Sequence, residues 1–247
     1  MATANVSEIA PDVFRLSLYM PQSDLEYNEF LVRDEQSLLF HTGPRKTFGE
    51  VLAAVRTLID PTKLRWIGFS HFEADECGAL NEWLTIAPDA QAICSDVAAR
   101  VNVNDFAEKP ARALVHGELL TTGRRRFRFL RTPHVPHAWE ASLLFEESER
   151  ILFCSDLFFQ SGRHPALTEA EVAAGAAATL RKYQASPMAN SVPYTPYTDR
   201  IMEGLAALAP GALAIMHGPT YRGDCAGQLR ALAASTRELL AADTKWP

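Results

Sequence analysis

Residues 64–76 read LRWIGFSHFEADE, an apolar strand followed at once by a dense set of ionisable side chains. His71, Glu73 and Asp75 alternate along the chain, and Glu76 adds a third carboxylate. Carboxylates crowded at the end of a buried strand repel one another unless a cation neutralises them. The stretch therefore favours a metal site. The alternative is a solvent-facing polar loop that starts a helix.

Three further segments place a candidate ligand where a predicted strand ends. They are ILFCSD at 151–156, LAIMHGP at 213–219 and TPHVPH at 132–137, which supply Asp156, His217 and either His134 or His137. Loops at strand ends are the usual place for sites in open α/β sheets. Each of these residues alone is more often a satisfied polar group, but four such strand ends together indicate one shared site.

Strand and helix signals interleave along the chain without a linker, a repeat or a low-complexity tract. The periodicity predicts strands over 13–20, 26–32, 37–41, 64–69, 91–94, 127–130, 142–145, 151–154 and 212–216. It predicts helices over 47–58, 79–86, 96–103, 169–183, 199–208 and 225–242, with a Pro-rich loop at 186–197. The 247 residues are 47% apolar, so we expect one α/β domain over 1–247, with sheets inside and helices outside.

The charge balance and the cysteine content exclude several classes of protein. A net charge of −6 argues against a broad nucleic-acid or anionic membrane surface, and the one basic cluster, 124–128, is predicted to be a solvated hairpin edge. No apolar run approaches 18 residues, and residues 1–11 lack a signal-peptide pattern. The four cysteines form no CxxC and are predicted to be reduced and mostly buried. We expect a cytoplasmic protein with no nucleic-acid or membrane partner.

The candidate site resembles that of the metallo-β-lactamase superfamily, and within it the flavodiiron and oxygen-binding diiron branch. The superfamily's HxHxDH motif becomes HxExD here because Glu73 stands at the second His, an exchange that marks the diiron branch rather than the zinc hydrolases. Residues 27–32 (YNEFLV) resemble the branch's early N-x-[YF]-L-[IV] strand. Residues 181–193 and 214–222 resemble its late helix, Pro-rich loop and HGP turn. The resemblance covers most of the chain and implies the αββα sandwich of this superfamily.

The resemblance also implies two metal ions that share one carboxylate. Carried over residue by residue, one ion would be held by His71, Glu73, His137 and Asp156. The other would be held by Asp75, Asp156 and His217, with Asp156 bridging. No catalytic residue is expected beyond these ligands.

The chain departs from the branch's pattern at three places. Where many members have a His after the motif Asp, this chain has Glu76, which either adds a carboxylate to the second ion or leaves that position open. The branch's H-W-P-D-S around the middle His reads HAWEA at 137–141, and His134 is the competing ligand. The spacing of 19 residues from His137 to the bridging Asp favours His137. His41 replaces the Asp of a D-T-G turn and is assigned no function.

The donor set indicates which metal the site would take. Three His and at least three carboxylates, without a thiolate, form a hard, oxygen-rich set, whereas zinc favours four ligands and nitrogen or sulfur donors. Two higher-coordinate ions that share a carboxylate suit iron or manganese better. We therefore predict two iron ions, with manganese or zinc as alternatives in the isolated protein.

The resemblance implies a non-haem diiron protein that binds dioxygen or nitric oxide. Only 30 residues follow His217 and they are predicted to form one turn and one helix, so we expect no flavin in this chain. We therefore expect an oxygen binder or sensor. The open alternatives are an O2 or NO reductase that uses a separate electron donor and a binuclear zinc hydrolase, against which Glu73 counts. A signalling partner and a homodimer also remain open.

Overall fold

The computed structural model describes residues 4–241, within which two seven-stranded sheets are found. The first sheet runs in chain order: β1 (Asn5–Ala10), β2 (Val13–Met20), β3 (Leu25–Val32), β4 (Leu38–Phe40), β5 (Trp66–Gly68), β6 (Gln91–Ser95) and β7 (Arg112–Leu114). The second has the order β12 (Leu167–Thr168), β14 (Thr220–Tyr221), β13 (Ala212–Ile215), β11 (Ile151–Ser155), β10 (Ser142–Glu146), β9 (Arg126–Arg131) and β8 (Leu119–Thr121).

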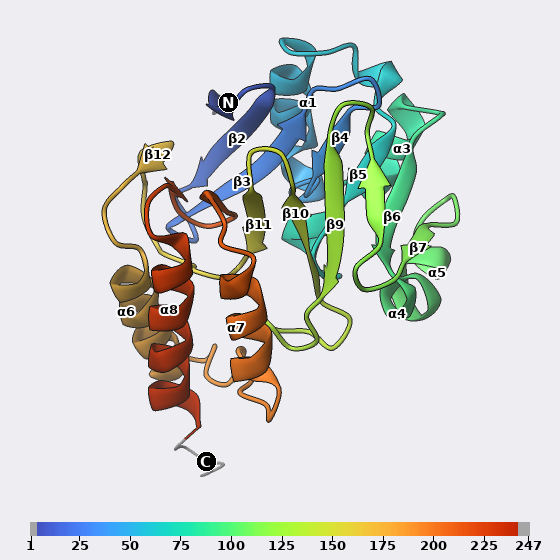
Figure 1. Ribbon diagram of the computed structural model, residues 1–247. Coiled ribbons are helices and arrows are strands. Elements are labelled where there is room, and N and C mark those ends of the chain that lie inside the picture. Colours follow the sequence, from blue (N-terminus) through green and yellow to red (C-terminus); the bar gives the residue numbers. More distant parts are fainter. Residues whose placement is uncertain (1–3, 242–247) are drawn as a thin grey trace.

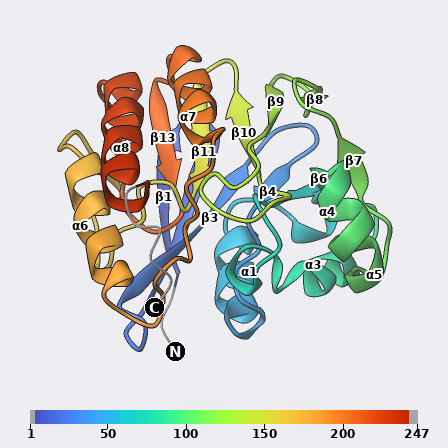
Figure 2. The same cartoon turned by 90° about the horizontal axis from the view of Figure 1, so that it is seen from below.

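Helices cover the outer face of each sheet (Figure 1). The N-terminal part contributes α1 (Phe48–Arg56), α2 (Ala74–Cys77), α3 (Leu80–Ile86), α4 (Asp96–Ala98) and α5 (Asn104–Phe106), with short turns at Arg45–Thr47 and Pro61–Lys63 and a π-helical turn at Ala99–Val103. The C-terminal part contributes α6 (Ala173–Gln184), α7 (Thr198–Ala207) and α8 (Cys225–Leu240). Figure 2 shows α6, α7 and α8 on one side of the strands and α1, α3 and α4 on the other.

Three apolar layers hold this sandwich together. Leu52, Val55 and Trp83 belong to the layer between the first sheet and its helices, and a second layer lies under α6, α7 and α8. Between the sheets, the ring of Phe153 packs 5.5 Å from that of Phe30 and 5.4 Å from that of Phe40. Burying large aromatic side chains on both inner faces is what binds one sheet to the other. The predicted αββα architecture is confirmed.

Strand direction brings the ends of several strands to one edge. Strands β4, β5, β6 and β7 pair in parallel, and β11 pairs in parallel with β13. Parallel neighbours present their carboxyl ends at the same edge of a sheet, where ligand sites form in α/β folds. The segments that follow β5, β9, β11 and β13 carry the candidate ligands.

Several local predictions were wrong. Strands β1, β7, β8, β12 and β14 were not predicted. The helix expected over 96–103 is α4 followed by the π-helical turn, and α5 begins after it at Asn104. The basic cluster does lie at the β8–β9 hairpin, but Arg125 is buried rather than solvated. Its guanidinium is 3.1 Å from Glu146, because a buried charge requires a partner. Residue 242, the last of the predicted final helix, lies outside the described residues.

The cysteine prediction is confirmed. Cys77, Cys94, Cys154 and Cys225 are all buried and free. Among residues 4–241, no helix is both long and apolar enough to cross a membrane.

Candidate metal centre

Seven ionisable side chains converge where the two sheets end at this edge. They come from the loop and α2 after β5, from the β9–β10 loop, and from the residues that follow β11 and β13. They are His71, Glu73, Asp75, Glu76, His137, Asp156 and His217. The side chains proposed as ligands from the sequence are therefore brought together, with His137 and not the alternative His134 among them.

Asp156 lies at the centre of the group. Its Oδ2 is 2.7 Å from Nε2 of His137 and 3.6 Å from Nε2 of His71. Its Oδ1 is 3.3 Å from Nε2 of His217. The two carboxylate oxygens therefore face different histidines, which is the arrangement that a carboxylate shared by two ions requires.

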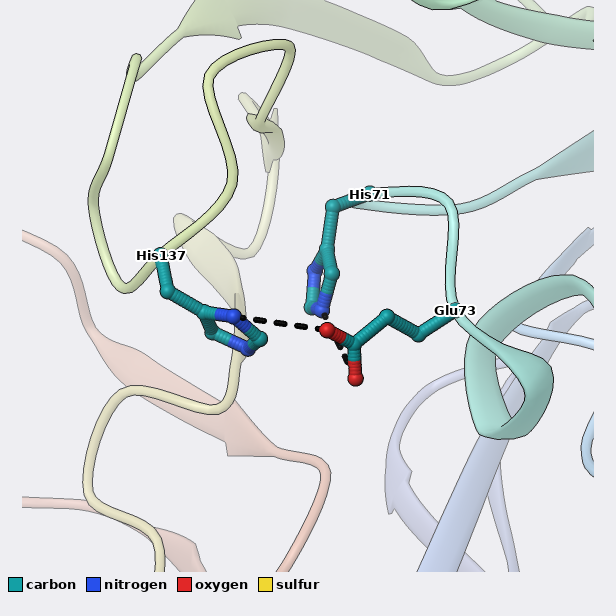
Figure 3. A group of neighbouring side chains, drawn as sticks. All are labelled: His71, Glu73 and His137. Carbon is teal, nitrogen blue, oxygen red and sulfur yellow. Dashed lines mark ion pairs between the residues drawn. The ribbon is translucent and has the colours of Figure 1, made fainter. Parts of the chain in front are cut away.

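The other side chains fall into two groups around Asp156. Figure 3 shows His71, Glu73 and His137 pointing toward one another, with Glu73 Oε1 3.5 Å from His137 Nδ1 and Glu73 Oε2 3.9 Å from His71 Nε2. On the other side, Asp75 Oδ2 is 3.3 Å from His217 Nε2. Each group combines imidazole nitrogen with carboxylate oxygen.

Buried atoms without partners show that this donor set fits a cation. Glu76 is fully buried, and its Oε1 is 3.5 Å from His71 Nε2. Within the described part of the chain, neither oxygen of Glu76 has a hydrogen-bond partner, and neither does Nε2 of His71. Buried polar atoms are almost always satisfied, and metal ions bound in this cluster would satisfy all three.

The pKa shifts show how protons balance the charge in the absence of a cation. Burial raises the pKa of Glu76 well above its usual range, and the Asp156 and Asp75 carboxylates raise it further. Burial alone would lower the pKa of His217, but its hydrogen bonds with Asp156 and Asp75 raise it to about 10. Metal ligands must be deprotonated, so binding a cation would release these protons.

Two of the histidines are oriented by their second ring nitrogen. Nδ1 of His217 is 2.7 Å from the backbone carbonyl oxygen of Glu26, and Nδ1 of His71 is 3.0 Å from Oγ of Ser70. A partner at Nδ1 fixes the ring and leaves Nε2 for the metal. Both Nε2 atoms face the carboxylate group described above.

A cluster of hydroxyl groups that was not predicted lies beside two of the candidate ligands, His71 and Asp156. Ser70 Oγ is 2.6 Å from Ser155 Oγ and 3.2 Å from Nε2 of His41, which is fully buried. Ser70 directly precedes His71 and Ser155 directly precedes Asp156, so the cluster ties a ligand of the first sheet to a ligand of the second. The sequence signal that could have indicated this cluster is a serine directly before the candidate ligand at each of these two strand ends.

The turn that carries His217 is held by the first sheet. Asn28 Nδ2 donates to backbone carbonyls on both sides of His217, at 2.9 Å each. Arg15 donates to the carbonyl of Gly218 at 3.2 Å and is itself buried in an ion pair with Glu26 at 2.8 Å. Asn28 is the Asn of the early strand motif, so the structure gives that motif a positioning role.

His134, the competing histidine, has a left-handed backbone with a φ of 63°, and its N–H donates to the carbonyl of Ala138. Among the described residues, the contacts of the cluster involve His137 and not His134. This geometry favours His137 as the middle ligand.

A second buried carboxylate lies near the site but outside it. Both oxygens of Glu29 are buried without a hydrogen-bond partner among the described residues, and burial raises its pKa to about 8. Gly43 has a left-handed φ of 74°, and a Cβ there would lie 2.5 Å from Oε1 of Glu29. Glu29 was not predicted, because its strand gives no sign that this side chain is enclosed.

We expect Glu29→Gln to stabilise the metal-free protein at alkaline pH and to leave it nearly unchanged near pH 5. Because its pKa is raised, Glu29 is neutral in the folded chain at low pH. The free energy of unfolding therefore falls as pH rises from about 4.5 toward 8, where the buried group must ionise. The gain at pH 9 should approach about 5 kcal/mol, since the pKa rises from 4.5 to about 8 and each pKa unit is worth about 1.4 kcal/mol. Urea unfolding at both pH values measures it.

The matched control is Glu171→Gln, which changes an exposed glutamate. It should leave the pH dependence of stability as it is. Equal effects of Glu29→Gln at pH 5 and pH 9 would contradict the assignment.

One cavity of about 430 Å³ opens on the cluster. It exposes Glu73, Asp75, His137, Asp156 and His217. Part of its wall comes from the Pro-rich loop, through Met188, Ser191, Val192 and Pro193. The loop predicted at 186–197 therefore borders the site.

Comparisons with known proteins agree with the fold and the motifs. A family model described as ODP family beta lactamase matches residues 25–214. Rubredoxin-oxygen oxidoreductase of Megalodesulfovibrio gigas is 30% identical over 202 residues, which are 80% of this chain and 49% of that protein. A nitric oxide reductase of Moorella thermoacetica is 26% identical over 235 residues, 89% of this chain and 57% of that protein.

Solved structures show the same architecture. Rubredoxin oxygen:oxidoreductase from Desulfovibrio gigas superposes with a TM-score of 0.79 at 23% identity, over 94% of this chain and 62% of that one. The flavodiiron protein from Giardia intestinalis superposes with a TM-score of 0.76 at 19% identity, over 94% of this chain and 59% of that one. The chain spans about half the length of the curated relatives named above.

Proposed function

Because the chain belongs to the ODP family of beta lactamases, we propose that it is a non-haem diiron protein that binds dioxygen or nitric oxide. The names of its relatives support this class of ligand, since one is a rubredoxin-oxygen oxidoreductase and another a nitric oxide reductase. The donor set supports iron, because it is rich in carboxylate oxygen and contains no thiolate.

The proposed ligands form two overlapping sets. One ion would be held by His71, Glu73, His137 and Asp156. The other would be held by Asp75, Asp156 and His217, with Glu76 as a further carboxylate. The observation that carries the proposal is the placement of Asp156, whose two oxygens face different histidines at 2.7 Å and 3.3 Å.

When bound, the two irons would supply a redox-active pair of cations with open positions for a diatomic gas. Groups of this chain orient the ligands around that position. Ser70 and the Glu26 carbonyl hold two imidazoles with Nε2 toward the centre. The rings of Tyr27 and Phe159 pack at 5.1 Å and 4.9 Å from the ring of His217, and the cavity beside them is lined mostly by apolar side chains. Such a lining offers water few hydrogen-bond partners apart from the ligands themselves.

The finer proposal is that the chain acts as an oxygen binder or sensor. Reduction of the gas with electrons from a separate donor protein is the second candidate, and the names of the relatives favour it. The two differ in whether the reaction stops after one turnover.

Metal analysis of anaerobically purified protein tests the proposal. We expect two ions per chain, mainly iron when iron is available during expression. Addition of O2 to the reduced protein should change the visible absorption once, and an oxygen electrode should then record no further uptake with NADH alone.

Three results would contradict these statements. One ion per chain, or zinc bound far more tightly than iron under anaerobic competition, would exclude the diiron proposal. Ester, thioester or β-lactam hydrolysis by the iron form at the 1 to 10³ per second that is roughly typical of enzymes would do the same. Continuous O2 uptake with NADH alone would overturn the binder and sensor proposal only.

A further inference from the structure

We propose that the cavity over the metal centre is a binding site for a neutral, mostly apolar small organic molecule, in addition to a diatomic gas. The site is formed by α6, α7, α8, the Pro-rich loop and the segment that follows β11. Nothing in the roles assigned above requires so large a space.

The volume of the cavity is the first argument. About 430 Å³ corresponds to roughly fourteen times the volume that one water molecule occupies in the liquid, about 30 Å³. A diatomic gas needs a space comparable to one water molecule. Pockets of about 300–1,000 Å³ are those that enclose organic ligands of moderate size.

The lining gives the chemical class of the ligand. Apart from the five candidate metal ligands, thirteen lining residues are apolar and five carry hydroxyls. Among the residues that the structure describes, no Lys or Arg lines the cavity. Two of the hydroxyls are already engaged, since Thr179 donates to the carbonyl of Gly175 and Thr198 Oγ1 accepts from the N–H of Thr195. A phosphate, sulfonate or carboxylate would therefore enter without a Lys or Arg side chain to receive it.

The charge of the metal-bound centre also favours a neutral ligand over an anion, and this step rests on the proposed function. Glu73, Asp75, Glu76 and Asp156 carry four negative charges when they bind metals, which equal the four positive charges of two ferrous ions. With neutral histidines, the reduced centre is neutral and exerts little attraction on an anion.

The test uses a pair of fluorescent probes that differ mainly in charge. N-phenyl-1-naphthylamine is neutral and fluoresces in apolar surroundings, and 1-anilinonaphthalene-8-sulfonate adds a sulfonate to the same ring system. We expect saturable binding of one neutral probe per chain in both the metal-free protein and the iron-loaded protein kept anaerobic and reduced. The sulfonate should bind at least ten-fold more weakly in both.

Variants locate the binding within the cavity. Ala176→Phe fills the cavity from α6, and Thr236→Phe fills it from a half-buried position on α8. Each should weaken binding of the neutral probe at least ten-fold. Ala178→Phe places the same side chain on the exposed face of α6 and should leave binding unchanged. If Ala176→Phe does not fold, Thr236→Phe decides.

The outcomes separate this inference from the proposed function. Absence of saturable binding, equal affinity for the two probes, or binding unaffected by both cavity variants would overturn the inference, even if two irons bind. Binding of the neutral probe with the expected responses to the variants would support it, even if metal analysis excludes the diiron centre.

Discussion

Replacing Asp156 with Asn is expected to remove both metal ions. Its two oxygens face different histidines, at 2.7 Å and 3.3 Å, so one side chain serves both ions. An amide keeps the volume but removes the charge and one oxygen. We expect affinity for both ions to fall by more than the roughly 10–100-fold that outer contacts of metal sites carry. Metal content after dialysis and competition with a chelator measure the loss.

The matched control is Asp89→Asn, which changes an exposed aspartate, and it should keep two ions per chain. Asp156→Ala should also lose both ions, but it leaves buried histidines without their partner, so its folding must be checked by circular dichroism. Retention of one tightly bound ion in Asp156→Asn would show that this carboxylate does not bridge.

The second large effect distinguishes the two histidines of one turn. His137→Asn should lose at least one ion per chain, because His137 Nε2 is 2.7 Å from Asp156 Oδ2 and its ring lies 4.3 Å from that of His71. His134→Asn should keep both ions. Asparagine suits the left-handed backbone at His134, so the change tests the side chain and not the turn.

Metal content of the two variants, prepared side by side, measures this difference. The reverse pattern, with ions lost in His134→Asn and kept in His137→Asn, would show that the wrong histidine has been assigned to the centre.

The sequence by itself determined the fold class and the group of candidate ligands. Strands that end in His71, Asp156 or His217 can be recognised locally, because a run of apolar residues is followed directly by an ionisable residue. The αββα sandwich followed from the resemblance, and the pairing of the strands confirms it. The buried state of the cysteines also followed from composition and spacing.

Short edge strands escaped prediction for a physical reason. In β1 only Ile9 and Ala10 are buried, and the strand exists because it pairs with β2. β14 has two residues, too few for any periodicity. The burial of Arg125, in the turn between β8 and β9, depends on Glu146, which lies on β10. In each case the stabilising partner lies outside the segment itself, so the residue pattern within the segment carries no information about it.

Only the tertiary structure decided how the ligands are supported and what lies above them. The hydroxyl cluster joins Ser70 to Ser155, which are 85 positions apart in sequence, and the backbone carbonyl of Glu26 orients His217 from 191 positions away. The burial of Glu29 and the 430 Å³ cavity arise where separate elements meet. Sequence patterns report which side chains are polar or apolar, whereas hydrogen-bond partners, enclosed volume and displaced pKa values depend on distances that folding alone sets.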